Sequence, residues 1–97
     1  MTSISVQNFN LLRQNEALNI LDIRDPQDFE MSHLPHAISV PATSLPNELK
    51  RLDKNATYYV ISYSGRRSEI IANFLENHGF KAVHVIGGMR DLKELAA

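Results

Sequence analysis

The sequence has no cysteine among its 97 residues, and this absence excludes disulfides, thiolate metal sites and cysteine nucleophiles within the chain. Long apolar runs are missing as well, since no uninterrupted stretch approaches the roughly 18 residues of a membrane span. The first residues, MTSISVQNF, have neither the basic patch nor the apolar segment of a signal peptide. We therefore expect a cytoplasmic protein that does not enter a membrane.

An excess of charge of one sign is also missing, because 10 basic side chains oppose 11 acidic ones and the net charge is -1. Without such an excess, nucleic acid and anionic membranes are not favoured as partners. The hydrophobic fraction of 43% and the charged fraction of 22% are those of an ordinary globular domain. A chain of this length forms one hydrophobic core. We expect a single domain over residues 1–97.

Short runs rich in apolar and β-branched residues recur along the chain, and each has the length of a buried strand. They alternate with segments in which apolar residues repeat at helical spacing. This alternation predicts an α/β domain with a mainly parallel central sheet of four to five strands, flanked by helices on both faces. The expected strands are residues 18–23, 37–41, 57–62 and 82–86, with a short extended entry at Ile4.

Capping residues and the helical spacing of apolar residues set the expected helices. Ser5 and Asp25 are the expected N-caps of the first two helices, and Gly79 suits the left-handed position at the end of the fourth. A stripe of leucines predicts the third. The expected helices are a first ending near Gln14, a second from Pro26, a third over residues 44–52, a fourth from Ser68, and a short amphipathic tail after residue 88.

Parallel sheets of this kind place ligand sites where the carboxyl ends of strands meet the amino ends of helices. Two such corners stand out, at residues 22–25 and 62–68. Asp22, Arg24, Asp25 and Asp28 could form an acidic site for a cation. We instead expect Asp25 to cap a helix, and Arg24 to pair with a buried or half-buried carboxylate that holds this corner near the second. The first corner is thus predicted to be a structural support.

The second corner, SYSGRRS, has the residues of an anion-binding turn. A tight turn before a helix points backbone N–H groups inward, and the helix adds its positive end. Gly65 supplies a conformation that a Cβ would penalise, while Arg66 and Arg67 add forked donors. Ser62 would stand at the centre, with Tyr63, Ser64 and Ser68 around it. The alternative is a solvated turn in which Ser68 merely caps a helix.

A cradle of this kind suits an ionised nucleophile, and cysteine ionises readily at such a site. A serine hydroxyl needs a neighbouring base instead. Spacing alone places neither His78 nor His84 beside Ser62.

Three segments together resemble the rhodanese-like (sulfurtransferase) domain. The segment ILDIRDPQDFEMSHLPHAISVP is similar to the family's N-terminal signature, SYSGRRS to its active loop of the form Cys-x-x-Gly-x-Arg-Ser, and VIGGM to the strand and glycine pair that follow. The resemblance implies a rhodanese-like fold without a cofactor. It also implies a loop cysteine that carries sulfur as a persulfide between a donor such as thiosulfate and a nucleophilic acceptor.

By this resemblance Ser62 stands at the position of the cysteine, residues 63–66 form the loop, and Arg67 is its closing arginine. Smaller departures from the family pattern are Ser32, His36 and Met89. An oxygen cannot replace the persulfide sulfur, so we expect this chain to be catalytically silent. Its expected ligands are a thiosulfate- or persulfide-like anion or sulfate, and a sulfur-relay protein is an expected partner.

Two explanations of Ser62 stay open. The first is a natural, non-catalytic family member that retains an anion-binding module. The second is a thiosulfate or persulfide sulfurtransferase represented by a Cys-to-Ser variant. Phosphatase-like loops of related design carry one residue more before the arginine, where this chain has Ser68. Metal is not expected, because Pro35 breaks the helical geometry that would align His33 with His36.

Overall fold

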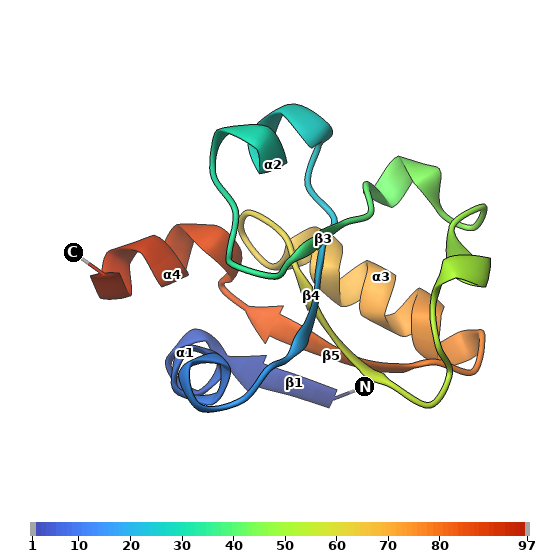
Figure 1. Ribbon diagram of the computed structural model, residues 1–97, viewed down its shortest axis with the longest axis horizontal. Helices are drawn as coiled ribbons and strands as arrows, with labels where there is room; N and C mark the ends of the chain where they lie inside the picture. Colours follow the sequence, from blue (N-terminus) through green and yellow to red (C-terminus); the bar gives the residue numbers. More distant parts are fainter. Residues whose placement is uncertain (1, 97) are drawn as a thin grey trace.

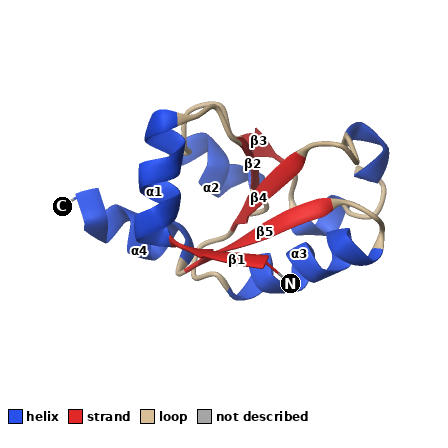
Figure 2. Cartoon of the chain, turned by 90° about the horizontal axis from the view of Figure 1, so that it is seen from below, coloured by secondary structure: helices blue, strands red, loops and turns tan. Residues whose placement is uncertain are grey.

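The protein is described by a computed structural model that covers residues 2–96. Within this range the strands form one parallel five-stranded sheet in the order β1-β5-β4-β2-β3 (Figure 2). The sheet expected from the sequence is confirmed, and the extended entry at Ile4 is its edge strand β1. The strand bounds are β1 Thr2–Ser5, β2 Asn19–Asp22, β3 Ile38–Ser39, β4 Thr57–Ile61 and β5 Lys81–Ile86.

Helices cover both faces of the sheet, as predicted (Figure 1). On one face Phe9 and Leu92 pack around Val85, and on the other Leu75 packs around Val60. Each face therefore has its own apolar layer. No helix within residues 2–96 has both the length and the apolar character needed to cross a membrane. The helix bounds are α1 Val6–Asn15, α2 Pro26–Met31, α3 Arg66–Asn77 and α4 Gly88–Ala96, with α1 and α4 on the first face and α3 on the second.

Two predicted helix ends are confirmed by the hydrogen bonds at them. The N–H of Asn8 donates to the Ser5 hydroxyl at 3.2 Å, so Ser5 caps α1. At the end of α3, Gly79 has a φ of 88°, and the Phe80 N–H reaches back to the Leu75 carbonyl at 3.0 Å. This is the glycine-terminated helix end that the sequence indicated.

The helix predicted over residues 44–52 is wrong. Two short 3-10 turns, Ala42–Ser44 and Leu49–Arg51, take its place. Pro46 explains the interruption, because it lacks an N–H and holds Leu45 extended at a ψ of 143°. The leucine stripe still contacts the core, but from irregular backbone.

Two other boundaries differ from the prediction. The strand expected over residues 37–41 shortens to Ile38–Ser39. Helix α3 begins two residues before the predicted Ser68, at Arg66, because Gly65 takes a left-handed φ of 96° and ends the turn there.

The two predicted corners lie side by side because their strands are neighbours. Strands β2 and β4 pair in parallel, with Asp22 opposite Ile61. One step further the Ile23 N–H still donates to the Ile61 carbonyl at 3.1 Å. The residues that follow each strand therefore emerge at the same edge of the sheet.

Candidate functional site

The first corner is a closed network of polar groups. Asp22 and Arg24 are 1% and 7% exposed, and the Arg24 Nη2 lies 2.7 Å from the Asp22 Oδ2. The same nitrogen donates to the Ser32 carbonyl at 2.7 Å, and the Arg24 backbone N–H donates to the Asp22 carboxylate at 3.1 Å. The hydrogen bond with Asp22 raises the pKa of Arg24, although burial opposes this. The corner therefore fixes the end of β2 against the end of α2.

The second corner closes around the Ser62 side chain. Ser62 follows β4 directly and is only 2% exposed. Its Oγ accepts hydrogen bonds from the N–H groups of Gly65 at 3.1 Å and of Ser68 at 3.3 Å. The turn brings these amides together because Gly65 adopts the left-handed conformation just before α3. Backbone donors from a loop and from the first turn of a helix thus converge on one oxygen.

The loop carbonyls face the start of α4. The N–H of Met89 donates to the Ser62 carbonyl, and that of Arg90 to the Tyr63 carbonyl, both at 2.9 Å. Because the peptide unit is planar and trans, the N–H groups of Tyr63 and Ser64 point the opposite way. Within residues 2–96 no backbone or side-chain acceptor bonds to either N–H. These two donors are available to a ligand.

A glycine allows this close approach of α4. A Cβ on Gly88 would lie 2.4 Å from the Ser62 carbonyl oxygen and 2.5 Å from that of Tyr63. Gly88 also has a φ of 60°, which favours glycine. The glycine pair noted in the sequence therefore lets α4 hold the loop through backbone contacts.

A buried histidine lies beneath the loop. His84, on β5, is 5% exposed, and its Nδ1 is 2.9 Å from the Ser68 Oγ. The same hydroxyl donates to the Gly65 carbonyl at 2.9 Å. Burial lowers the pKa of His84, and the nearby Glu69 partly opposes this effect. Ser68 thus links the loop, α3 and β5.

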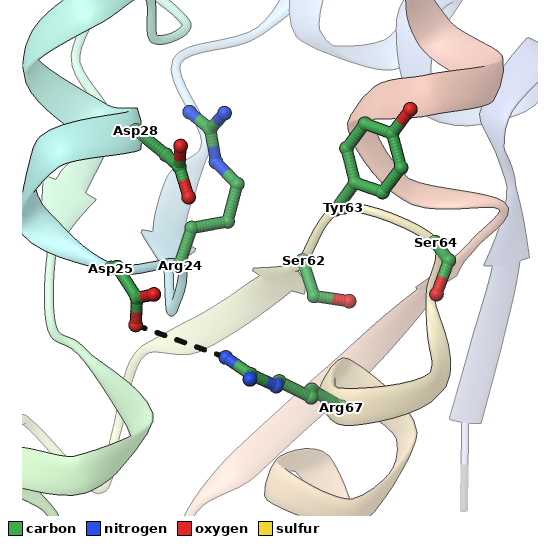
Figure 3. A pocket seen from close by; sticks show the side chains of 7 residues that line it. All are labelled: Arg24, Asp25, Asp28, Ser62, Tyr63, Ser64 and Arg67. Carbon is green, nitrogen blue, oxygen red and sulfur yellow. Dashed lines mark ion pairs between the residues drawn. The ribbon is translucent and has the colours of Figure 1, made fainter.

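A pocket of about 260 Å³ opens in front of the loop (Figure 3). Asp25 and Asp28, from the first turn of α2, face the loop across it. Arg67 extends from α3 toward Asp25, with 3.9 Å between its Nη1 and the Asp25 Oδ1. Carboxylates and guanidinium groups therefore balance one another, and the loop amides supply the donors that favour an anion. The lining residues are Arg24, Asp25, Asp28, Ser62, Tyr63, Ser64 and Arg67.

The structure brings most of the predicted site residues together. Ser62, Tyr63, Ser64 and Arg67 line the pocket with Arg24, while Gly65 and Ser68 lie beneath the loop and Asp22 behind Arg24. Arg66 departs from the prediction, because it is exposed and does not line the pocket.

Sequence reasoning placed Asp25 at the first corner only as a helix cap, and it assigned neither Asp28 nor His84 to the site. Asp25 has the predicted N-cap position, but its side chain makes no capping hydrogen bond and faces Arg67 instead. A signal for His84 was present, because it stands in the middle of an apolar strand, where a polar side chain is buried and needs a partner.

The two histidines considered for metal binding, His33 and His36, differ in their surroundings from a metal site. The His33 ring stacks on Phe29, and its Nδ1 lies 2.7 Å from the Phe29 carbonyl oxygen. His36 adopts a φ of 66°. In the described part of the chain no three or more His, Cys, Asp or Glu side chains are grouped to hold a metal ion.

Comparison with known proteins identifies relatives of this chain in sequence and in fold. The family model for the rhodanese-like domain matches residues 5–95. The chain is 40% identical over 78 residues to the "Putative sulfur carrier protein YrkF" of Bacillus subtilis, covering 79% of this chain but only 42% of that protein. It is 32% identical over 87 residues to the thiosulfate sulfurtransferase GlpE of Tolumonas auensis, covering 90% and 82% of the two chains. The crystal structure of SSP1007 from Staphylococcus saprophyticus superposes with a TM-score of 0.90 at 36% identity, covering 95% of this chain and 93% of that one.

Proposed function

This chain belongs to the rhodanese-like domain family, and from that premise we propose that it binds a small sulfur-bearing anion at residues 62–68 without transferring sulfur itself. One observation carries the proposal. The Ser62 Oγ, at the position of the family's cysteine, accepts hydrogen bonds from two backbone N–H groups in a buried turn. The domain extends, in this proposal, over residues 1–97.

Donors in the loop support anion binding. The Tyr63 and Ser64 N–H groups point away from α4, and the first turn of α3 adds the positive end of its dipole. Hydrogen bonds to a charged group contribute about 1.5–3 kcal/mol each. A few such bonds are enough to hold a small anion in the pocket despite the two carboxylates across it.

The environment of Ser62 supports the absence of catalysis. An oxygen cannot form the persulfide, and a serine nucleophile of any kind would need a base within hydrogen-bonding distance. The His84 Nδ1 contacts Ser68 rather than Ser62. The His78 Nδ1 lies 2.8 Å from the Phe74 carbonyl, near the far end of α3. Neither histidine is placed to deprotonate Ser62.

The names of the relatives support the chemical class of the ligand. GlpE is named a thiosulfate sulfurtransferase, and YrkF a putative sulfur carrier protein. We therefore include a thiosulfate- or persulfide-like anion or sulfate as ligand and a sulfur-relay protein as partner. The cytoplasm is proposed as location from the sequence alone. The convergent amides also favour a second candidate, a sulfurtransferase site in which oxygen stands in place of the cysteine sulfur.

The test is thiocyanate formation from thiosulfate and cyanide by this chain and by two single-cysteine variants. We expect no turnover by the unmodified chain. Ser62→Cys places sulfur at the convergent amides, whereas Ser3→Cys places it on exposed β1 as the matched control. Turnover by Ser62→Cys alone would support the second candidate. Turnover by the unmodified chain would contradict the proposed silence.

Binding decides the first candidate separately. If neither variant turns over but sulfate or thiosulfate shifts the amide NMR resonances of residues 62–68, the anion-binding module is supported. If no anion shifts them, the proposed binding function is wrong.

A further inference from the structure

His84 lies on the face of the sheet that α3 covers, directly beneath the loop. In the register of the sheet it stands between Ser3 of β1 and Val60 of β4, so neither neighbouring strand places a titratable side chain beside it. Val60 belongs to the apolar layer under α3, and paired residues of neighbouring strands share a face. This imidazole is 5% exposed, so its polar contacts come from α3 and the loop.

The charged groups around His84 come from the first turns of α3. Glu69 partly favours the protonated imidazole, which burial disfavours. Arg66 and Arg67 lie on the same part of the helix, and both are exposed. On the loop side the neighbour is uncharged, because a Cβ on Gly65 would lie 3.4 Å from the His84 Cε1. Glu69 is therefore the charged group that acts on the protonation of His84.

A chain of hydrogen bonds leads from this histidine to the anion-binding turn. The Ser68 Oγ lies 2.9 Å from the His84 Nδ1 and 2.9 Å from the Gly65 carbonyl oxygen. The backbone N–H groups of Ser68 and Gly65 both donate to the Ser62 Oγ, at 3.3 and 3.1 Å. Ser68 and Ser62 are 0% and 2% exposed, so water does not screen this path.

The Ser68 hydroxyl has a single proton and two acceptors within reach. A neutral imidazole can carry its proton on Nε2. Its Nδ1 then accepts the Ser68 hydrogen bond, and the Gly65 carbonyl keeps the Glu69 N–H at 3.2 Å but loses the hydroxyl. A protonated imidazole donates from both nitrogens, so the hydroxyl must donate to Gly65. Protonation of His84 therefore fixes the turn at Gly65 and adds a positive charge beneath the loop amides.

We propose that His84 is a positioning residue for the anion site, and that an anion at the loop amides and a proton on His84 bind cooperatively. The added positive charge attracts the anion through a region closed to water, where charges interact strongly. The coupling is reciprocal, so the anion favours the proton as much as the proton favours the anion. This proposal rests on the proposed anion-binding function and adds its regulation by pH.

The experiment follows the histidine Cε1–H NMR signals of the unmodified chain during a pH titration. One sample contains saturating sodium sulfate, and the other contains sodium chloride at the same ionic strength. We expect sulfate to raise the pKa of His84, because its negative charge favours the imidazolium. The signal of His78, exposed near the far end of α3, is the internal control for general salt effects.

The same coupling should appear in the affinity for sulfate, measured from the amide shifts of residues 62–64. We expect this affinity to increase about tenfold as the pH falls from above 6.5 to below the folded pKa of His84, which burial holds under 6.5. The sign follows from the charge, since the form that predominates at lower pH is the imidazolium.

Two variants separate His84 from the other titrating groups. His84→Asn keeps a side chain that can hydrogen-bond to Ser68 but does not titrate, so its sulfate affinity should lose most of the pH dependence. The matched control His78→Asn should retain it. Asp25 and Asp28 line the pocket in both variants, so their contribution cancels in the comparison. If His84→Asn does not fold, the titration of the unmodified chain decides by itself.

The remaining outcomes distinguish the coupling from the binding function. Sulfate that shifts the loop amides without raising the pKa of His84 would overturn the coupling and leave the anion-binding function intact. A full pH dependence of sulfate affinity in His84→Asn would do the same. No shift of the loop amides at any pH would overturn the anion-binding function, and the coupling with it.

Discussion

The two strand ends that meet at this edge of the sheet satisfy their polar groups in opposite ways. After β2, the Asp22 carboxylate and the Arg24 guanidinium bond to each other and to the Ser32 carbonyl. After β4, backbone N–H groups converge on the single hydroxyl of Ser62, and further amides have no acceptor within residues 2–96.

This difference distinguishes a corner with a structural role from a corner that can bind a ligand. Side chains that satisfy each other's hydrogen bonds have few donors or acceptors left for a ligand. Breaking a buried pair of this kind costs much stability, because it leaves one charge unpaired. Backbone amides cannot turn away individually, because the loop conformation holds them together. The first corner therefore fixes β2 against α2, and the second corner is the part that can bind.

Removing the carboxylate of the first corner should have the largest effect. Asp22→Ala leaves the Arg24 charge buried without its partner, and we expect a loss of about 3–5 kcal/mol in the free energy of unfolding. Urea denaturation measures it. Glu48→Ala breaks the exposed pair with Arg51 and should change stability by no more than about 0.5 kcal/mol. Equal effects of the two variants would contradict the supporting role of the first corner.

Separating the loop from α4 should have the next largest effect. In Gly88→Ala the new Cβ would overlap the Ser62 and Tyr63 carbonyl oxygens at a positive φ, so we expect a loss of about 3 kcal/mol. Gly79→Ala is the matched control, because it also has a positive φ but its Cβ would meet only the flexible Lys54 side chain at 3.5 Å or more. This control should lose about 1 kcal/mol. A Gly88→Ala variant as stable as Gly79→Ala would show that the close contact is not needed.

Removing the hydroxyl beneath the loop should have a moderate effect. Ser68→Ala deletes the hydrogen bond to the Gly65 carbonyl and leaves the buried His84 Nδ1 without this partner. We expect a loss of about 1–2 kcal/mol in unfolding free energy together with weaker anion binding. Exposed Ser3→Ala should leave both unchanged. Unaltered anion affinity in Ser68→Ala would mean that Ser68 supports the fold but not the loop.

Protonating His84 should have the smallest effect. Burial lowers its pKa in the folded protein below the ordinary value of 6.5, so the unfolded chain takes up this proton at higher pH than the folded one. His84 therefore adds stability above pH 6.5, and this contribution is lost as the pH falls from 6.5 through the lower folded pKa. As the pH is lowered through this window, the unfolding free energy of the unmodified chain should fall more steeply than that of His84→Asn. Parallel curves would contradict the buried, neutral histidine.

Much of the fold could be predicted because its signals are local. Runs such as TYYVI favour a strand, Ser5 begins α1 by accepting an N–H through its side chain, and Gly79 ends α3 with its own left-handed backbone. The helix predicted over residues 44–52 was wrong because a leucine stripe indicates only which residues are buried. Irregular backbone buries them equally well once Pro46 interrupts the helix.

The candidate site was only partly predictable. Parallel-sheet topology brings residues 22–25 and 62–68 to one edge whatever their side chains are. Which side chains face the pocket depends on how α2 and α3 are turned, and local sequence does not encode this. Asp25 and Arg67 therefore face each other across the opening, while Arg66, adjacent in sequence, does not line the pocket.

The most direct test of the central claim is the thiol pKa of the Ser62→Cys variant. The chain has no other cysteine, so the absorbance of a single thiolate can be titrated. Converging amides and the start of α3 should hold this pKa below the ordinary value of about 8.5, while the exposed control Ser3→Cys titrates near it. A pKa at or above about 8.5 for the Ser62→Cys thiol would show that burial outweighs the amides, and would contradict an anion site at this loop.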